Sequence, residues 1–269
     1  MDIQDKVIWV TGGCSGMGLA STKLFLSKGA KVMVTDINEE DGVKLDKELG
    51  EKMIFVKADM TKTEELEKAV DTVTNKWGSL DVLMTCAGVA GEAWGVPMKL
   101  NPEKMAEGVF EWNYNLDEGP ASIEKFKADI AINLTGNYDA ARLAAWEMLK
   151  NQPNEDGERG VIIFISSIAV DTTHSPGYAC GYAAAKSGII ALTKEMACNL
   201  GPGGIRVNCI KPGFFDTPLV KHMAPFQHLW TSRHLFPKRA GDPKDIATMA
   251  AEIIGNVFVN NSVMKVAAY

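Results

Sequence analysis

The sequence is poor in the features that mark membrane, disulfide-rich and metal-binding proteins. No apolar run approaches the roughly 20 residues that a membrane-spanning helix requires, so we expect no membrane segment. Five cysteines, odd in number, are scattered through 269 residues, as is typical of thiols that stay reduced. The four histidines, His174, His222, His228 and His234, show no ligand spacing, and we expect no metal site.

An excess of basic charge is also missing. The formal net charge is -6, which gives no electrostatic case for binding nucleic acid. No basic, apolar leader precedes the first expected strand, so we expect no signal peptide and a cytoplasmic protein. No repeat, low-complexity tract or linker divides the chain, which indicates one domain over residues 1–269.

What the chain does contain is a regular alternation of strand and helix patterns. Apolar runs predict strands over 6–11, 31–35, 53–57, 81–85, 161–165, 205–210 and 262–269. Helical spacing predicts helices over 19–26, 64–77, 123–150 and 182–200. This alternation is typical of an α/β, single-domain, Rossmann-type doubly wound parallel sheet with helices on both faces.

A glycine-rich turn follows the first predicted strand. Gly12, Gly16 and Gly18 surround Ser15 and Met17 immediately before a helical pattern. Glycines let the backbone turn sharply and let a pyrophosphate approach the helix N-terminus, where free N–H groups favour an anion. The alternative is a glycine turn without a ligand, but the strand-turn-helix context favours a dinucleotide site.

The second predicted strand ends at Asp36, and this carboxylate bears on the choice of cofactor. A carboxylate at this position binds the ribose hydroxyls of NAD and repels the 2′-phosphate of NADP. Ile37 follows it, and the glycine turn offers no arginine or lysine. The alternative role, capping the next helix, suits Asn38 better. We therefore expect NAD and not NADP.

Tyr182 and Lys186 are four residues apart within a predicted helix, so they share one face. A phenol titrates near ~10 in water, and proton transfer at neutral pH needs a cation nearby to favour the phenolate. A pair of this kind is weak evidence alone. Together with the glycine turn it indicates acid-base chemistry beside a bound dinucleotide.

These motifs, combined, resemble the short-chain dehydrogenase/reductase family over nearly the whole chain. The resemblance rests on Thr11-Gly12-x3-Gly16-x-Gly18, Asp59, Ala87-Gly88, Asn133, Ser167, Tyr182-x3-Lys186 and Pro212-Gly213-x3-Thr217-Pro218. It implies an NAD-dependent oxidoreductase that interconverts a secondary alcohol and a ketone. The hydride chemistry would belong to the cofactor, and the protein would supply geometry and proton transfer.

The resemblance also implies residue roles. Tyr182 would exchange the proton, Lys186 would lower the tyrosine pKa and hold ribose hydroxyls, and Ser167 would hydrogen-bond the substrate oxygen. Asn133 would hold a water in a proton relay, Asp59 would contact adenine, and Thr217 the nicotinamide carboxamide or a phosphate. The expected cofactor contacts are Gly12, Ser15, Gly16, Met17, Gly18, Asp36, Ile37, Asp59, Met60, Cys86, Ala87, Gly88, Tyr182, Lys186, Pro212, Gly213, Phe215 and Thr217.

Three features depart from the family pattern. Cys86 stands where asparagine is usual, which puts a supporting hydrogen bond near the cofactor in doubt. Ser167 lies fifteen residues before Tyr182, two more than usual, so Ser166 is the alternative substrate contact and an enlarged loop is expected around 171–174. The predicted last strand lacks the usual aspartate-glycine pair.

Two long stretches interrupt the alternation and bear on the substrate. The insertion 89–122 and the segment 214–240 both follow strand ends, where open α/β sheets bind ligands; they indicate either a mobile substrate lid or ordinary packing with a solvated basic rim, and the sequence leaves both open. Their aromatic residues are Trp94, Trp112, Phe214, Phe215, Phe226 and Trp230, and the basic ones are Lys221, Arg233, Lys238 and Arg239. With the resemblance, they favour a hydroxyacyl-CoA thioester, with a neutral cyclic or aromatic alcohol as the alternative.

The last expectation concerns assembly. The family commonly pairs two helices with their copies, and we expect a homotetramer or dimer. Ala140, Ala141, Ala144 and Ala145, with Ala191 and Leu192, would allow close packing between subunits. A second class of function, a non-catalytic subunit of a larger oligomer, is suggested by Cys86 and the altered C-terminus, although the intact Asn133, Ser167, Tyr182 and Lys186 favour an active enzyme.

Overall fold

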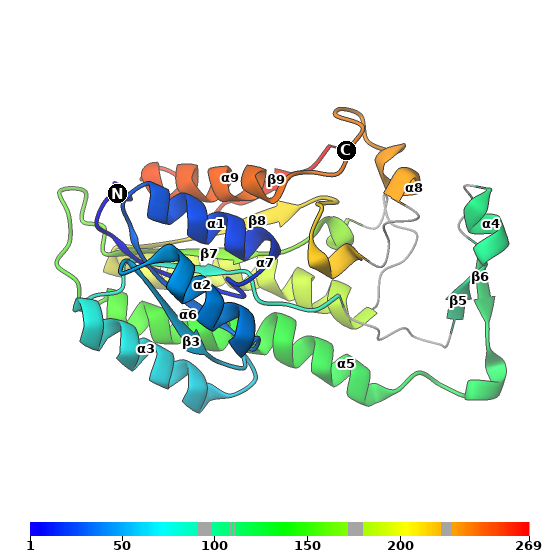
Figure 1. Cartoon of the computed structure of the whole chain (residues 1–269), viewed down its shortest axis with the longest axis horizontal. Coiled ribbons are helices and arrows are strands. Elements are labelled where there is room, and N and C mark those ends of the chain that lie inside the picture. The colour runs from blue at the N-terminus through cyan, green and yellow to red at the C-terminus, as the bar shows by residue number, and fades with distance from the viewer. Residues whose placement is uncertain (91–97, 108, 110, 172–179, 222–226, 269) are drawn as a thin grey trace.

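The computed structural model describes residues 1–90, 98–107, 109, 111–171, 180–221 and 227–268. Its central element is a sheet of seven strands, all paired in parallel (Figure 1). The strands are β1 (Val7–Thr11), β2 (Lys31–Asp36), β3 (Met53–Lys57), β4 (Val82–Thr85), β7 (Gly160–Ile165), β8 (Ile205–Pro212) and β9 (Val263–Val266). Their order is β3-β2-β1-β4-β7-β8-β9, and all seven predicted strands are confirmed.

Helices cover both faces of this sheet. They are α1 (Gly16–Ser27), α2 (Glu39–Leu49), α3 (Thr63–Trp77), α5 (Ile123–Ile130), α6 (Gly136–Met148), α7 (Cys180–Leu200) and α9 (Pro243–Gly255). Alternate residues of β1 enter two different cores: Ile8 packs with apolar residues of α1, α2 and α9, and Trp9 with those of α3, α6 and α7. This arrangement explains why the strands read as continuous apolar runs and confirms the doubly wound fold.

Two helices differ from the sequence prediction. The predicted helix 123–150 is interrupted by the π-helical turn η2 (Ala131–Thr135), which holds the buried Asn133. Helix α9 was not predicted, although Asp242 caps its first turn in a capping box with Asp245 and Pro243 opens it. That cap was the available signal. Asn38 caps α2 through its side chain, as suggested.

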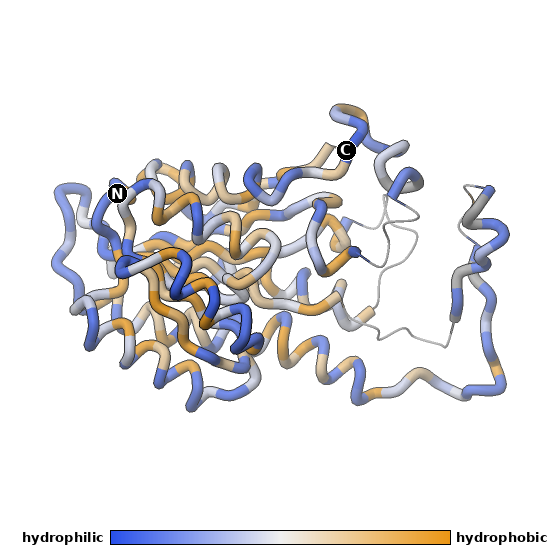
Figure 2. The backbone as a smooth tube through the Cα atoms, viewed as in Figure 1, coloured by the Kyte–Doolittle hydropathy of each residue, from blue (hydrophilic) through white to orange (hydrophobic). Residues whose placement is uncertain are grey.

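The insertion forms a small arm instead of covering the sheet. It contains β5 (Met98–Leu100), α4 (Pro102–Ala106), β6 (Trp112–Tyr114) and the one-turn η1 (Leu116–Glu118), with β5 and β6 antiparallel. Figure 1 shows this arm apart from the sheet, beyond α5, and Figure 2 shows that its described part is largely hydrophilic. Trp94 and the side chain of Trp112 lie outside the description.

The segment 214–240 includes α8 (Gln227–Thr231), and its expected lid role is wrong for one residue. Phe215 is buried in the core, and its backbone forms a bridge to Gly241. A side chain fixed in this way does not belong to a lid that opens. Phe226, His222, Thr172, Thr173, His174 and the side chain of Trp230 lie outside the described residues.

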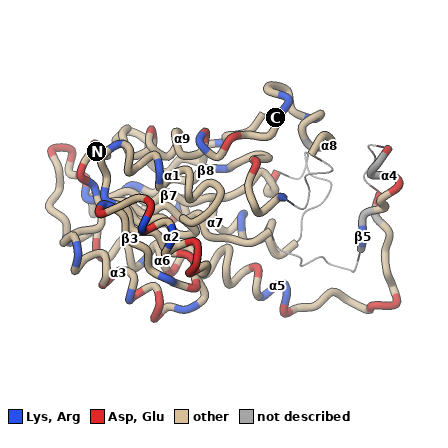
Figure 3. Tube along the Cα trace, viewed as in Figure 1, with Lys and Arg blue, Asp and Glu red and all other residues tan. Residues whose placement is uncertain are grey.

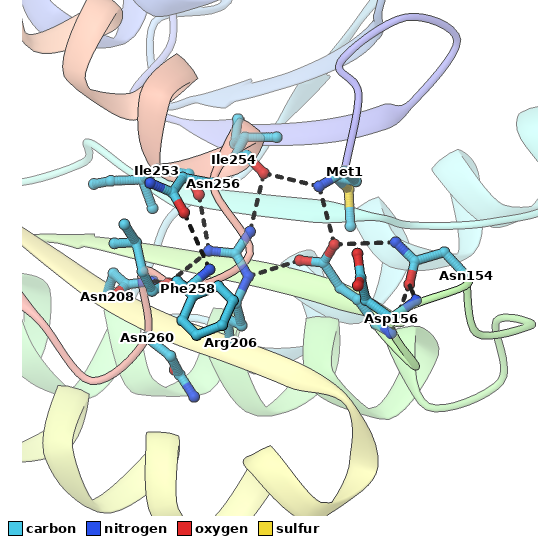
Figure 4. Close-up of polar contacts among 12 residues, drawn as sticks. Met1, Asn154, Asp156, Arg206, Asn208, Ile253, Ile254, Asn256, Phe258 and Asn260 are labelled. Carbon is cyan, nitrogen blue, oxygen red and sulfur yellow. Dashed lines mark hydrogen bonds and ion pairs between the residues drawn. The ribbon is translucent and has the colours of Figure 1, made fainter.

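At the amino ends of the strands, a buried ion pair joins three parts of the chain (Figure 4). The Arg206 guanidinium on β8 donates to Glu158 at 2.7 Å and to the carbonyl oxygens of Ile253, Ile254 and Val259. The Met1 ammonium also lies 3.0 Å from the Glu158 carboxylate. The pair therefore connects β8, the loop before β7 and the end of α9. It lies at the opposite ends of the strands from the carboxyl ends, where ligands bind in such folds.

The alanines expected at a subunit contact lie elsewhere. Ala140, Ala141, Ala144 and Ala145 are buried within this chain, against the sheet. The sequence interpretation of these four residues is therefore wrong, because their helix turns this small-residue face inward. The exposed face of α6 carries Tyr138, Trp146 and Leu149 instead. Charges of both signs are mixed along the described chain (Figure 3).

Candidate functional site

The glycine turn lies where the chain passes from β1 to α1. Gly12 and Gly16 adopt positive φ values of 63° and 50°, and a Cβ on Gly18 would collide with the Gly12 carbonyl. Ser15 precedes α1 without a side-chain cap, and the first turn holds no acidic residue. The N–H groups of this turn can therefore meet an anion, as a dinucleotide pyrophosphate requires.

A cavity of about 440 Å³ opens beside this turn. It lies where the strand order reverses, between β1 and β4, at the carboxyl ends of the strands. Its lining is Gly12, Ser15, Gly16, Met17, Gly18, Thr35, Asp36, Ile37, Ala58, Asp59, Met60, Thr61, Cys86, Ala87, Gly88, Val89, Ile132, Thr217, Pro218 and Leu219. The size and the donor set fit a dinucleotide.

The structure brings most of the expected cofactor residues to this cavity, but not all. Pro212, Gly213, Phe215, Tyr182 and Lys186 do not line it. Thr35, Ala58, Thr61, Val89, Ile132, Pro218 and Leu219 line it without having been predicted. Six of these lie directly beside a predicted site residue and Leu219 lies two residues after Thr217, so sequence proximity to a motif was the available signal.

Asp36 occupies the end of β2 and faces the glycine turn. Its carboxylate accepts hydrogen bonds from the backbone N–H of Cys14 at 3.2 Å and of Asn38 at 3.1 Å. Burial, followed by the charge of Asp36, raises the pKa of the Cys14 thiol to about 12, so this thiol stays protonated. The β2–β3 register sets Lys57 opposite Asp36, yet its ammonium is paired with Glu39 at 2.8 Å.

Asp59, two residues after the end of β3, also lines the cavity. Its carboxylate accepts hydrogen bonds from both the backbone N–H and the hydroxyl of Thr61, at 2.9 and 2.8 Å. The backbone hydrogen bond from Thr61 lowers the pKa of Asp59 below its usual value. A fixed, ionised carboxylate in this place suits hydrogen bonding to an amino group of a base.

The end of β4 is supported without the usual asparagine. Cys86 donates its backbone N–H to the Thr11 carbonyl at 3.0 Å, and Ala87 donates to the Thr11 hydroxyl at 3.2 Å. Thr11 therefore fixes this strand end to β1, and the substitution at Cys86 leaves the backbone support in place. Across the cavity, Thr217 lies against the glycine turn, because a Cβ on Gly16 would come within 3.3 Å of its methyl group.

Helix α7 presents the tyrosine and lysine to the end of β7. Lys186 is buried and donates to the Ile165 carbonyl at 2.9 Å, and its Nζ lies 5.7 Å from the centre of the Tyr182 ring. Ser167, the second residue after β7, hydrogen-bonds the Tyr182 side chain. Ser166 instead donates its hydroxyl to the Lys186 carbonyl at 2.8 Å. Of the two serines, only Ser167 has its hydroxyl at the tyrosine.

Burial sets the proton affinities of this group. It raises the pKa of the Tyr182 phenol, and the hydrogen bond with Ser167 lowers it by less. Burial lowers the pKa of Lys186 to about 8. The sequence led us to expect a lowered tyrosine pKa, and the direction differs because loss of water outweighs the hydrogen bond.

Asn133 links this group to the cavity. Its Oδ1 accepts a hydrogen bond from the Val89 N–H at 3.1 Å, whereas its buried Nδ2 has no partner among the described residues. A Cβ on Gly88, which lines the cavity, would lie 2.7 Å from Asn133 Oδ1 and 3.6 Å from Lys186 Nζ. Gly88 therefore lines the cavity, and Asn133 and Lys186 lie directly behind this residue at that end of the cavity.

Within the described part of the chain, no helix is both long and apolar enough to cross a membrane. The same residues contain no group of three or more His, Cys, Asp or Glu side chains placed to hold a metal ion. The site therefore consists of the cavity and the Ser167, Tyr182, Lys186 and Asn133 side chains at its end.

Comparison with known proteins agrees with this geometry. The pattern of the short chain dehydrogenase family matches residues 6–228. The 3-hydroxyacyl-CoA dehydrogenase type-2 of Bos taurus is 35% identical over 98% of this chain and 94% of its own length. Ipsdienol dehydrogenase of Ips pini is 33% identical over 97% of this chain and 94% of its own.

A solved dehydrogenase structure has the same fold. The 3-hydroxyacyl-CoA dehydrogenase type-2 of Mycobacterium avium superimposes with a TM-score of 0.85 at 30% identity, covering 99% of this chain and 96% of that one. Short-chain dehydrogenases generally use NAD or NADP and act on small molecules. With this sheet, this cavity and these relatives, the chain is an oxidoreductase that belongs to the short-chain dehydrogenase family.

Proposed function

We propose that this enzyme interconverts a secondary alcohol and a ketone with NAD as its cofactor. The observation that carries the proposal is that Ser167, Tyr182 and Lys186 form one group, and that Lys186 and Asn133 lie directly behind Gly88, which lines the cavity. When bound, NAD would accept or return a hydride. The accompanying proton must come from the protein when a ketone is reduced and pass to the protein when an alcohol is oxidised.

Each side chain in this group has a distinct part. Tyr182, kept protonated by burial, would donate its proton to a ketone oxygen and recover it from the alcohol. Ser167 would hydrogen-bond the same oxygen as its charge changes. Lys186 would bind the ribose hydroxyls, and the unpaired Nδ2 of Asn133 would hold a water that links Lys186 to solvent.

The test is direct. Purified protein mixed with NAD and a panel of secondary alcohols should produce NADH, measured by its absorbance. Tyr182→Phe should bind NADH as the unmodified enzyme does, yet lose roughly a hundred- to ten-thousand-fold in turnover, as expected for a lost acid-base group. Full activity in Tyr182→Phe would place the proton donor elsewhere. No turnover of any alcohol or ketone would favour the alternative, a non-catalytic subunit.

The preference for NAD rests on Asp36. Its fixed carboxylate would repel a 2′-phosphate, and the nearby Lys57 ammonium is occupied by Glu39. Titration calorimetry should therefore show tighter binding of NADH than of NADPH. Asp36→Asn keeps the size of the side chain but removes its charge. It should reduce the ratio of the NADH and NADPH affinities by about tenfold, or ~1.4 kcal/mol. Equal affinities in the unmodified enzyme would contradict the assignment.

For the substrate we favour a hydroxyacyl-CoA thioester, because the relatives of Bos taurus and Mycobacterium avium are named for it. Arg233 and Lys238 are exposed and suit a phosphate-bearing tail. The alternative is a neutral alcohol, favoured by the similarity to ipsdienol dehydrogenase. Arg233→Ala and Lys238→Ala should raise KM for a CoA ester and spare a small neutral alcohol. Equal effects on both would favour the neutral alcohol.

Two further assignments complete the proposal. The five cysteines are all unpaired, which supports a location in the reducing cytoplasm. The exposed face of α6, formed by Tyr138, Trp146 and Leu149, supports association into a dimer or tetramer, because large apolar side chains on one helix face commonly mark a contact.

A further inference from the structure

The ion pair between Asp171 and Lys211 lies close to the catalytic group but has no part in the chemistry proposed above. Lys211, near the end of β8, donates to both carboxylate oxygens of Asp171, at 2.9 and 2.8 Å. The two side chains are only 15% and 31% exposed. A partly buried pair bonded through both oxygens is screened less by water than a surface pair, and holds its partners more firmly.

Asp171 ends the same single turn that Ser167 begins. This turn is η3 (Ile168–Val170), with Ser167 as its N-cap and Asp171 as its C-cap. The Ser167 hydroxyl accepts a hydrogen bond from the Ala169 N–H at 3.1 Å, and the Asp171 N–H donates to the Ile168 carbonyl at 2.8 Å. A displacement of Asp171 would therefore be passed through one short turn to the Ser167 hydroxyl.

The other side of Ser167 is already fixed. Ser166 donates its N–H to the Ile210 carbonyl of β8 at 2.9 Å and its hydroxyl to the Lys186 carbonyl of α7. Strand pairing between β7 and β8 stops at this point, after Ile165 and Ile210. Beyond it, the Asp171–Lys211 pair is the described side-chain ion pair that joins this turn to β8. Ser167 thus lies between two attachments to the same strand.

Lys211 also needs this partner. The β8–β9 register places it beside Lys265, and side chains of paired residues on parallel strands point to the same face. The Asp171 carboxylate offsets the repulsion between these two cations.

We propose that Asp171 and Lys211 are positioning residues, which hold the η3 turn on β8 so that the Ser167 hydroxyl stays at Tyr182. The inference rests on the proposed function for its catalytic consequence, but not for the structural one. It also gives the lengthened stretch between Ser167 and Tyr182 a fixed point at Asp171, directly where the enlarged loop was expected to begin.

The first test measures the turn without using activity. The probe is the Ala169 amide, whose N–H donates a hydrogen bond to the Ser167 hydroxyl. Its hydrogen exchange should be at least about tenfold faster in Lys211→Met and in Asp171→Asn, because local opening of the turn exposes this amide to water. Lys211→Arg should restore the slow exchange. The matched control is Lys6→Met, which breaks a half-buried lysine-aspartate pair with Asp81 at the opposite edge of the sheet and should leave Ala169 unchanged. Unchanged exchange in Lys211→Met would overturn the inference.

The second test is a double-mutant cycle on turnover of the alcohol or ketone found by the panel. Lys211→Met should lower kcat by about tenfold or more, because small displacements of reacting groups are costly, and should leave NADH affinity unchanged. In a Ser167→Ala background, the same substitution should change kcat by less than about twofold, since no hydroxyl remains to position. A full effect in that background would show that the pair acts elsewhere and overturn the inference. Activity retained by Tyr182→Phe would instead defeat the proposed function and leave the exchange result intact.

Discussion

Ser166 and Ser167 are adjacent and chemically identical, yet the structure gives them separate tasks. The Ser166 hydroxyl is used in a buried hydrogen bond to the Lys186 carbonyl. Ser167, one residue later, has left the strand and directs its hydroxyl to Tyr182. Its backbone is still extended, with φ -162° and ψ 153°, so the side chains of the two serines point to opposite sides, and this decides which of them can reach a substrate. Ser166→Ala is therefore a packing change, and Ser167→Ala a chemical one.

Lys186 gives a pH prediction at the same scale. Its pKa falls from 10.5 to about 8 because burial disfavours the ammonium, so the unfolded chain binds more protons than the native one between these values. Stability should therefore rise with pH from about 8 to 10.5, by up to roughly 3 kcal/mol. Lys186→Met should lack this rise. Urea unfolding at pH 7 and pH 10 measures it, and parallel curves for both proteins would contradict it.

At the scale of elements, the start of α1 is tightly constrained. Gly12, Gly16 and Gly18 are required by two positive φ values and by the approach of one backbone segment to another. The π-helical turn between α5 and α6 is the second special element, because it turns Asn133 toward Gly88. Both lie at the cavity, where departures from regular geometry are commonly functional.

Gly18→Ala should therefore damage cofactor binding. The new Cβ would meet the Gly12 carbonyl, and the backbone must move to relieve the contact. We expect NADH affinity to fall by at least about tenfold, or ~1.4 kcal/mol, measured by titration calorimetry. Gly201→Ala is the matched control, because a Cβ there meets nothing within 4 Å, and it should bind normally. Normal binding by Gly18→Ala would mean that the turn can adjust.

At the scale of the whole molecule, the carboxyl and amino ends of the parallel strands have different roles. The carboxyl ends of the strands carry the cavity and the Ser167, Tyr182 and Lys186 side chains, and the amino ends are closed by Arg206 and Glu158. This second site touches no cavity residue. It is expected to serve stability and leave the chemistry alone.

Arg206→Met should separate the two tasks. The substitution leaves the Glu158 carboxylate and three carbonyl groups without this partner. Because one member of a buried pair is lost, the free energy of unfolding should fall by about 3 kcal/mol or more. The activity of the protein that remains folded should be unchanged. Lys23→Met, which breaks an exposed pair with Glu48, should cost less than about 1 kcal/mol in the same urea titration. Equal costs would refute the assignment.

Assembly is the second property of the whole molecule. Trp146 is 66% exposed on the outer face of α6, and a charge there should disrupt a subunit contact. Trp146→Glu is expected to shift an oligomer toward monomer in light scattering at micromolar concentration. Phe258→Glu changes a still more exposed aromatic residue outside that face and should leave the mass unchanged. A monomeric unmodified protein would show that this face has another role.

The sequence by itself determined the succession of the seven strands along the chain, the glycine turn and the tyrosine-lysine pair. These depend on local rules: apolar periodicity, the φ angles open to glycine, and the four-residue repeat of a helix face. A prediction at this level required only neighbours along the chain, which is why all seven strands agree and why Gly12, Gly16 and Asp36 meet at one cavity.

Only the tertiary structure decided what depends on distant neighbours. The inward face of Ala140 to Ala145, the burial of Phe215 and the raised pKa of Tyr182 all follow from packing between segments far apart in the sequence. The pairing of Asp171 with Lys211 joins residues 40 positions apart, and no local pattern announces it. Burial and long-range contacts are set by how the helices cover the sheet, and a linear pattern of residues does not contain that information.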